Sequence, residues 1–221
     1  MFSRIQARHF RCLKAVDQRL GPVQALVGPN GSGKTTFLEG IGLLGDLIRA
    51  RRDVRDVLHQ RSAPFEKLVW QGPEQSPDAS PAFQLAVEAP IPACVRRQMA
   101  EDKQGYQSVR YEIEIGLDAG RNELGLNHET LSLCKLVSEP VLAPRLPFPD
   151  VPRVAPTVFV KPLTRGYKVA VKKIPDGNDN YYTEGPKKYM PSFRLGRTRL
   201  ALAHIPADEE SFPVSTWFRG L

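Results

Sequence analysis

Residues 27 to 42, VGPNGSGKTTFLEGIG, place the strongest constraint on what this 221-residue chain can fold into. Gly28, four further residues and then Gly33, Lys34 and Thr35 have the spacing of a phosphate-binding loop, with an extra glycine at position 31. Glycines suit such a loop because it must turn tightly and bring backbone N–H groups against phosphate oxygens. A helix that begins near Gly33 would point its positive end at the same phosphates.

The residues on each side of the loop predict the strand–loop–helix context that the motif requires. Residues 22–28, PVQALVG, form a short apolar run that ends in glycine, which is typical of a buried strand. Residues 34–50 carry apolar side chains at helical spacing, namely Phe37, Leu38, Ile41, Leu44, Leu47 and Ile48. The alternative is a glycine-rich turn that binds nothing, but the third glycine and the context favour a nucleotide site.

Charge is distributed unevenly along the chain, which has a net charge of +7. Lys and Arg outnumber Asp and Glu by 11 to 5 in residues 1–61 and by 13 to 7 in residues 145–221, whereas residues 62–144 have 7 against 12. The two basic segments could form one cationic face for nucleic acid, with DNA as a partner. A solvated surface is the alternative.

Other bulk features favour a cytoplasmic protein without a membrane partner. No apolar run approaches 18 residues, and the first ten residues do not resemble a signal peptide. The three cysteines, Cys12, Cys94 and Cys134, show no metal-ligand spacing and are expected to be free thiols.

Periodicity predicts a chain with many strands and few helices. Alternating side chains predict a hairpin at residues 3–20 and further strands at residues 66–72, 83–89, 106–117, 123–137, 157–162, 167–174 and 180–185. Helical segments are expected at residues 53–60, 192–205 and 208–221, the last starting at Asp208 to Glu210. Residues 72–82 and the proline-rich residues 139–156 are expected to be loops.

The N-terminal sequence resembles the opening of SMC/RecF-type ATPases, the ABC-type branch of P-loop proteins that includes OLD-like ATPases. The resemblance covers roughly the first 50 residues and is carried by HFR at residues 9–11 and by GPNGSGKT at residues 28–35. His9 stands where the family has Asn. The implied fold class is α/β: the N-terminal lobe of a P-loop ABC-type head with a β-rich antiparallel insert and C-terminal helices. Its expected parts are a core (1–61), a β-rich lobe (62–190) and a helical segment (191–221) that leads to a separate C-terminal half.

The resemblance implies ATP and Mg²⁺ as cofactors and a role for each loop residue. Thr35 would bind Mg²⁺, Thr36 would touch the α-phosphate, and Arg11 would lie near the base or phosphates. The β- and γ-phosphates would be held by Gly28, Asn30, Gly31, Ser32, Gly33 and Lys34. Members of this family dimerise head to head around ATP, so a second copy and a C-terminal half or second subunit are the expected protein partners.

Phosphoryl transfer needs further groups that are hard to find in this sequence. The resemblance implies an apolar strand that ends in Asp-Glu, but neither residues 112–118 nor residues 201–210 have this pattern. It also implies a Ser-Gly signature, and residues 131–135 lack the glycine. Gln60 and Gln71 are candidates for sensing the γ-phosphate, although each is more simply read as a surface residue. If the isolated chain does hydrolyse ATP, Asp118, Glu209 and Glu210 are the first candidates for an unrecognised catalytic carboxylate. The isolated chain is therefore expected to bind nucleotide and hydrolyse it negligibly.

Three functions remain open at this point. The first is the ATP-binding part of an SMC/RecF-type ATPase that acts in DNA repair or anti-phage defence. The second is a small P-loop nucleotide kinase, which the two strands before the loop and the β-rich centre disfavour. The third is a nucleotide-gated binding subunit that does not hydrolyse ATP.

Overall fold

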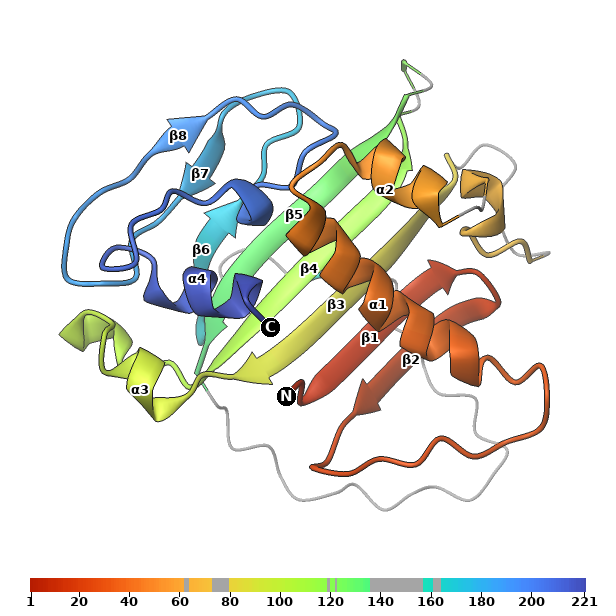
Figure 1. The fold of residues 1–221 in the computed structure, drawn as a ribbon, viewed down its shortest axis with the longest axis horizontal. Helices are drawn as coiled ribbons and strands as arrows, with labels where there is room; N and C mark the ends of the chain where they lie inside the picture. Colours follow the sequence, from red (N-terminus) through yellow and green to blue (C-terminus); the bar gives the residue numbers. More distant parts are fainter. Residues whose placement is uncertain (62–63, 73–79, 119, 122, 136–156, 161–163) are drawn as a thin grey trace.

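The computed structural model describes residues 1–61, 64–72, 80–118, 120–121, 123–135, 157–160 and 164–221. Eight strands form one antiparallel sheet in the order β2-β1-β3-β4-β5-β6-β7-β8 (Figure 1). The strands are β1 (Arg4–Phe10), β2 (Leu13–Arg19), β3 (Ala82–Pro90), β4 (Ser108–Leu117), β5 (Leu124–Cys134), β6 (Tyr167–Lys172), β7 (Asp179–Tyr181) and β8 (Ser192–Phe193). With the helices below, this confirms the α/β class. The sheet draws strands from all three predicted parts of the chain, and their division into domains stays a prediction.

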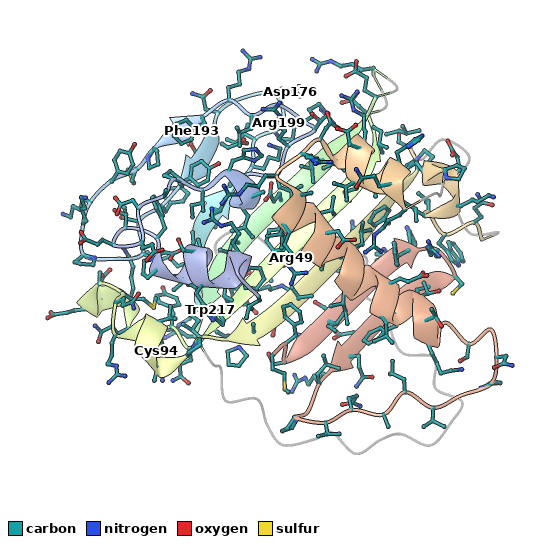
Figure 2. The ribbon with its side chains drawn as sticks, in the orientation of Figure 1. Arg49, Cys94, Asp176, Phe193, Arg199 and Trp217 are labelled. Carbon is teal, nitrogen blue, oxygen red and sulfur yellow. The ribbon has the colours of Figure 1, made fainter. Side chains whose placement is uncertain are left out.

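The helices lie mostly on one face of this sheet, where α1 crosses the central strands diagonally (Figure 1). They are α1 (Lys34–Ala50), α2 (Val54–Gln60), α3 (Ala93–Arg96) and α4 (Pro213–Arg219), with short 3-10 turns η1 (Phe65–Lys67), η2 (Glu101–Lys103) and η3 (Leu202–His204). Arg49 of α1 donates from Nη2 to the Leu221 carbonyl oxygen at 3.0 Å, and Figure 2 labels Arg49 on α1 and Trp217 on α4. The predicted helices at residues 34–50 and 53–60 are confirmed.

Strands β3, β4 and β5 form the centre of the core because their alternating apolar side chains meet α1. Phe83, Leu85 and Ile113 are almost fully buried, and Leu85 pairs in register with Ile113. The amphipathic face of α1 contributes Leu43, Leu44 and Leu47 to the same cluster. The predicted hairpin at residues 3–20 and the three central strands are confirmed, apart from residues 136–137, which lie outside the described part of the chain.

The predicted strand at residues 22–28 is wrong for this chain. These residues form no strand and are exposed, with Val23 and Val27 exposed by 92% and 91%. An apolar run becomes a strand only when neighbouring strands bind its N–H and C=O groups, and none of the eight strands of the described sheet pairs with it. The apolar pattern of residues 22–28 is real, but a sequence pattern does not show whether a neighbouring strand is available to pair with it.

Two further predicted strands are absent because other contacts hold their backbones. In residues 66–72, only Val69 forms a bridge, to Phe10, after the 3-10 turn at Phe65–Lys67. In the predicted strand 157–162, residues 157–160 form no strand, since side chains of β3 and β4 bind their backbone instead. Residues 161 and 162 lie outside the described part of the chain, as do residues 73–79 and 139–156 of the predicted loops.

The C-terminal prediction is also partly wrong. Residues 192–205 contain the two-residue strand β8 and the 3-10 turn η3 in place of a helix. The buried carboxylate of Glu129 accepts from the N–H groups of Ala201 and Leu202 at 2.7 and 2.9 Å, which fixes this turn. The last helix begins at Pro213, and Asp208 instead accepts from Ser211 in the turn before it.

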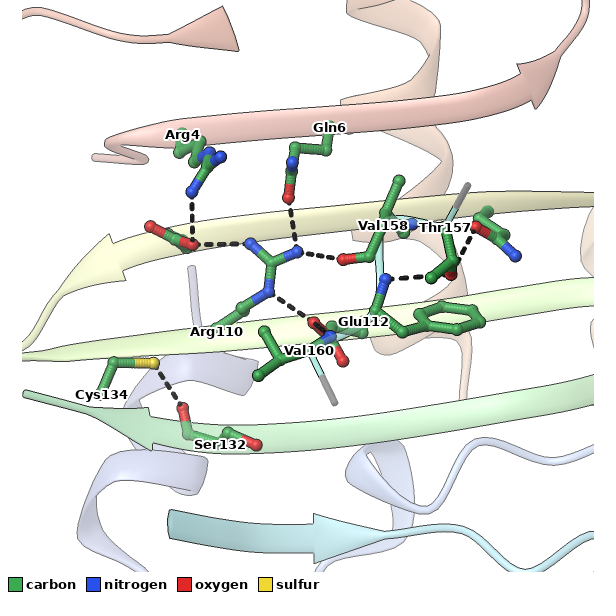
Figure 3. Close-up of polar contacts among 12 residues, drawn as sticks. Arg4, Gln6, Arg110, Glu112, Ser132, Cys134, Thr157, Val158 and Val160 are labelled. Atoms are coloured by element: carbon green, nitrogen blue, oxygen red, sulfur yellow. Dashed lines mark hydrogen bonds and ion pairs between the residues drawn. The ribbon is translucent and has the colours of Figure 1, made fainter. Parts of the chain in front are cut away.

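A buried ionic network covers the opposite face of the central strands (Figure 3). Arg110 of β4, whose side chain is 3% exposed, forms ion pairs with Glu88 and Glu112 and donates to Gln6 and to the Val158 carbonyl oxygen. The Val160 N–H donates to Glu112 at 2.9 Å, so residues 157–160 are bound across the sheet. Arg110, Glu88 and Glu112 thus each have a charged partner. In the described residues, no helix is long and apolar enough to cross a membrane.

Candidate nucleotide site

The glycine-rich loop leads directly into α1, which begins at Lys34 after Gly33. Gly31 and Gly33 have φ of 78° and 87°, a left-handed conformation that strains other residues. A Cβ on Gly33 would lie 2.9 Å from Leu13 Cδ2 and 3.4 Å from Cys12 Sγ, whereas one on Gly31 would meet nothing within 4 Å. The turn between β1 and β2 therefore packs against the end of the loop, and the middle of the loop remains open.

Lys34 places its ammonium group inside the loop. Its Nζ atom donates to the carbonyl oxygens of Gly28 at 2.8 Å and Pro29 at 2.6 Å, and lies 3.4 Å from Ser32 Oγ. Thr35 is exposed and Thr36 is half-buried. A helix end with free N–H groups, a lysine and open glycines form a donor set that fits phosphate oxygens. The predicted loop residues thus lie together, and their roles with ATP and Mg²⁺ stay predictions.

The turn between β1 and β2 connects the first strands to α1. Arg11 has a left-handed φ of 50°, and its Nη1 atom lies 2.7 Å from Glu39 Oε2 on α1. The thiol of Cys12 donates to Thr36 Oγ1 at 3.3 Å. Arg11 thus lies beside the first turns of α1, but Glu39 is its ion-pair partner in this structure.

An open cleft of about 610 Å³ adjoins the start of α1. It is lined by Arg11, Cys12, Thr36, Glu66, Lys67, Val69, Trp70 and Gln71. Backbone pairing brings the last of these residues here, because Arg11 N–H donates to the Leu68 carbonyl oxygen and Trp70 N–H donates to that of His9. The sequence did not indicate that Trp70 lies near the loop. The signal that could have found it is the pairing of residues 68–70 with 9–11, a long-range contact.

Trp70 is held in place by its neighbours. The His9 ring stacks on it with centroids 5.5 Å apart, and Lys14 Nζ lies 5.7 Å from its centroid. Burial lowers the pKa of His9, and the charges of Arg8 and Lys14 lower it further. A neutral imidazole stacks on the indole without placing another cation beside Lys14. His9, which stands where related sequences are expected to have Asn, therefore has a packing role here.

The two candidate glutamines lie in different places. Gln71 lines the cleft with Arg11 and Thr36, and its amide donates to the Glu66 carbonyl oxygen at 3.0 Å. Gln60, on α2, lines another cleft with Asp46, eleven residues beyond Thr35 on α1. At 1.5 Å per residue, that is about 17 Å along the helix axis. The structure therefore brings Gln71, and not Gln60, near the loop.

The carboxylates singled out in the sequence lie away from this cleft. Asp118 pairs with Arg197 at 2.7 Å, and the pKa of Asp118 is lowered by the N–H groups of Gly120 and Arg121. Glu209 and Glu210 precede α4. Glu66 is the carboxylate among the residues that line the cleft. In the described part of the chain, no cluster of three or more His, Cys, Asp or Glu side chains could hold a metal ion.

The comparisons with known proteins concern mainly the N-terminal region. Residues 23–89 match a family model described as "AAA domain, putative AbiEii toxin, Type IV TA system". An OLD nuclease from Thermus scotoductus is 52% identical over 56 residues, which is 25% of this chain and 11% of the relative. The RecF DNA replication and repair protein of Vibrio cholerae is 54% identical over 44 residues, 20% of this chain and 12% of the relative.

A solved SMC ATPase structure, from work on ATP-driven dimerization and DNA-stimulated activation, is also similar. The structural match covers 57% of this chain and 69% of the solved chain, with 18% sequence identity and a TM-score of 0.36. That score is too low to support a shared fold, so the assignment rests on the sequence matches.

The loop, the helix that follows it and these matches make the N-terminal region similar to P-loop proteins of the ABC type. Within that class, the N-terminal region is similar to those of an OLD nuclease and of RecF. The matched stretches span about a tenth of the length of the curated relatives, at 11% and 12%.

Proposed function

We propose that this chain is the ATP-binding part of an SMC/RecF/OLD-type ATPase that couples nucleotide binding to work on DNA. The observation that supports it most is the packing of the β1–β2 turn against Gly33 at the start of α1, which leaves the loop open around Gly31. ATP would replace the Gly28 and Pro29 carbonyls as the acceptors of the Lys34 ammonium group. DNA repair as the setting is supported by the name of the RecF relative, and anti-phage defence is the alternative setting that we propose.

In this proposal each loop residue has one task. The N–H groups of residues 30–33 and the positive end of α1 hold the β- and γ-phosphates. Thr35 supplies its hydroxyl to Mg²⁺, which would neutralise phosphate charge when bound. Thr36, held by the Cys12 thiol, faces the α-phosphate. The cleft that begins at Thr36 then receives the ribose and base, and Gln71 is the better placed candidate for contact with nucleotide.

We further propose that hydrolysis requires a C-terminal half of the head, supplied by a longer chain or a second polypeptide, and a second copy. The exposed apolar side chains of Val23 and Val27 support this, since they would be buried once residues 22–28 pair as a strand. Asp118, Glu209 and Glu210 lie elsewhere, so a partner would supply a carboxylate to bind Mg²⁺ beside the Thr35 hydroxyl. A subunit that binds nucleotide without hydrolysing it is the alternative.

Titration of a fluorescent ATP analogue with Mg²⁺ tests the proposal. Lys34→Ala should weaken binding at least tenfold because the loop loses its only side-chain cation, while Lys172→Ala, an exposed lysine on β6, should bind like the native chain. Thr35→Ala should lose mainly the dependence on Mg²⁺. Native affinity in a folded Lys34→Ala variant would contradict the assignment.

Turnover separates the alternatives. Steady-state ATPase activity without and with DNA should be negligible for this chain and should appear when the C-terminal half is added. Activity that stays absent in the completed head would favour the non-hydrolysing subunit. Transfer of phosphate to a nucleoside acceptor would instead indicate a kinase.

A further inference from the structure

A third cleft, of about 690 Å³, lies toward the opposite end of the sheet from the loop. The 3-10 turn η2 contributes Asp102 and Lys103 to its lining, β6 contributes Lys168, and the chain after β7 contributes Tyr182, Lys188 and Met190. Strand β6 is four places from β1 in the sheet, which is about 19 Å at the usual strand spacing. The cleft is therefore separate from the candidate nucleotide site.

Three lysines converge on this cleft with a single carboxylate, Asp102, among its lining residues. Lys103 Nζ donates to the Thr183 carbonyl oxygen at 2.6 Å, and Lys168 Nζ lies 3.4 Å from Asp102 Oδ2. The second contact is weak, since both side chains are well exposed, at 42% and 67%. The pKa of Lys103 is lowered by burial and then by the charges of Lys168 and Lys188, while Asp102 and Glu184 act in the other direction. The ammonium groups thus repel one another, and a bound anion would relieve this repulsion.

Apolar side chains are exposed beside these cations. Tyr182 and Met190, both in the cleft, are exposed by 38% and 69%, and Tyr189 is exposed by 46%. Lys187, exposed by 59%, lies beyond the cleft, where its Nζ atom is 3.6 Å from Asp208 Oδ2. Phosphate alone would require only the cations. Exposed ring faces next to cations are what single-stranded nucleic acids bind, because their bases are free to stack, whereas duplex bases are already stacked.

We propose that this cleft binds a single-stranded nucleic acid, with its phosphates at Lys103, Lys168 and Lys188 and a base on the ring of Tyr182. A free nucleotide would use the cleft alone, whereas a longer strand also reaches Lys187 and Tyr189. This inference names the form of nucleic acid and the surface, and it does not depend on ATP binding at Lys34.

Fluorescence anisotropy with a labelled oligothymidine of about 15 nucleotides tests the cleft, since one such site spans roughly 4–16 nucleotides. The variant with Lys103→Gln, Lys168→Gln and Lys188→Gln should bind at least tenfold more weakly. Its log–log salt dependence should flatten by about 0.7 for each phosphate that the lysines no longer neutralise. Tyr182→Leu should lose at least fivefold with an unchanged salt slope, and Tyr182→Phe, which keeps the ring, should bind like the native chain.

A charge-matched control lies at the far end of α1, where Arg51, Arg52 and Arg55 are exposed. Changing these three to Gln should leave oligothymidine binding within about twofold, and thermal melting should show that every variant is folded. The proposal is overturned if the lysine variant binds normally, if the arginine control accounts for the loss, or if an unlabelled duplex or free nucleotide competes as well as the single strand. Lys34→Ala should bind the oligonucleotide normally, which separates a failure of this proposal from a failure of the nucleotide site.

Discussion

The loop segment, residues 21–33, and the central strands β3, β4 and β5 are packed in opposite ways. In the loop segment, Val23 and Val27 are almost fully exposed, whereas Phe83, Ile113 and Leu131 in the strands are fully buried. The buried guanidinium group of Arg110 on β4 binds two carboxylates, an amide oxygen and a backbone carbonyl oxygen. The central strands thus form a packed core, whereas the apolar side chains of the loop segment are not covered by any part of the chain that the structure describes. None of the eight strands of the described sheet pairs with residues 22–28, so this part of the loop segment is open to contacts with another polypeptide.

The largest expected effect comes from the buried charge in the central strands. Arg110→Met should lower the free energy of unfolding by about 3–5 kcal/mol, because Glu112 and Glu88 lose their partner inside the protein. Urea denaturation followed by circular dichroism measures this change. Arg52→Met, at an exposed arginine, is the matched control and should change the stability by less than about 0.5 kcal/mol. Equal effects of the two substitutions would mean that the Arg110 network does not hold the sheet together.

A second effect concerns the buried carboxylate that holds α4 on the core. Glu184 accepts from the N–H groups of Val214 and Ser215 and from the Ser215 hydroxyl, and burial raises its pKa to about 7 from 4.5. The folded chain therefore binds more protons than the unfolded chain between these pH values, and stability should fall as pH rises from about 4.5 to 7. The change is at most about 3 kcal/mol. Denaturation midpoints across this range measure it.

Glu184→Gln should remove this component and give a flatter pH profile than the native chain. Glu209→Gln, at an exposed carboxylate before α4, should keep the native profile. A native slope in Glu184→Gln would show that another group titrates in this window.

The smallest effect is expected in the loop segment. Val27→Ser should change the stability of the isolated chain by less than about 0.5 kcal/mol, because the valine is 91% exposed and leaves no cavity. Denaturation under the conditions used for Arg110→Met measures it. A loss above about 1 kcal/mol would mean that Val27 packs in the folded chain and that the contrast between the two regions is wrong.

Much of the fold could be predicted wherever local pattern and tertiary packing agree. The β1–β2 hairpin, α1 and the central strands have clear periodicity and partners within the chain. Residues 22–28 have the pattern without a partner. Residues 192–205 have helical spacing, but Glu129 binds the amides of Ala201 and Leu202 and fixes a turn. Tertiary contacts override local propensity in such places.

The candidate site also has a part that the sequence predicts and a part that depends on tertiary contacts. The loop from Gly28 to Thr36 could be read from the sequence because one local motif contains all of its residues. The cleft could not, since Trp70 and Gln71 reach it through backbone pairing with residues 9–11. Sequence spacing alone also could not distinguish Gln71 from Gln60. Gln71 lines the cleft, whereas Gln60 lies on α2, beside the C-terminal part of α1.

Hydrogen exchange of the amides of residues 23–28 tests the central claim most directly, with the amides of β4 as the internal reference. In the isolated chain, residues 23–28 should exchange at nearly the rate of an unfolded peptide, while β4 stays protected. Adding a C-terminal half of the head together with Mg-ATP should protect residues 23–28, and the Lys34→Ala variant should show less protection. Protection of residues 23–28 in the isolated chain equal to that of β4 would contradict the account, as would continued fast exchange in a completed head that hydrolyses ATP.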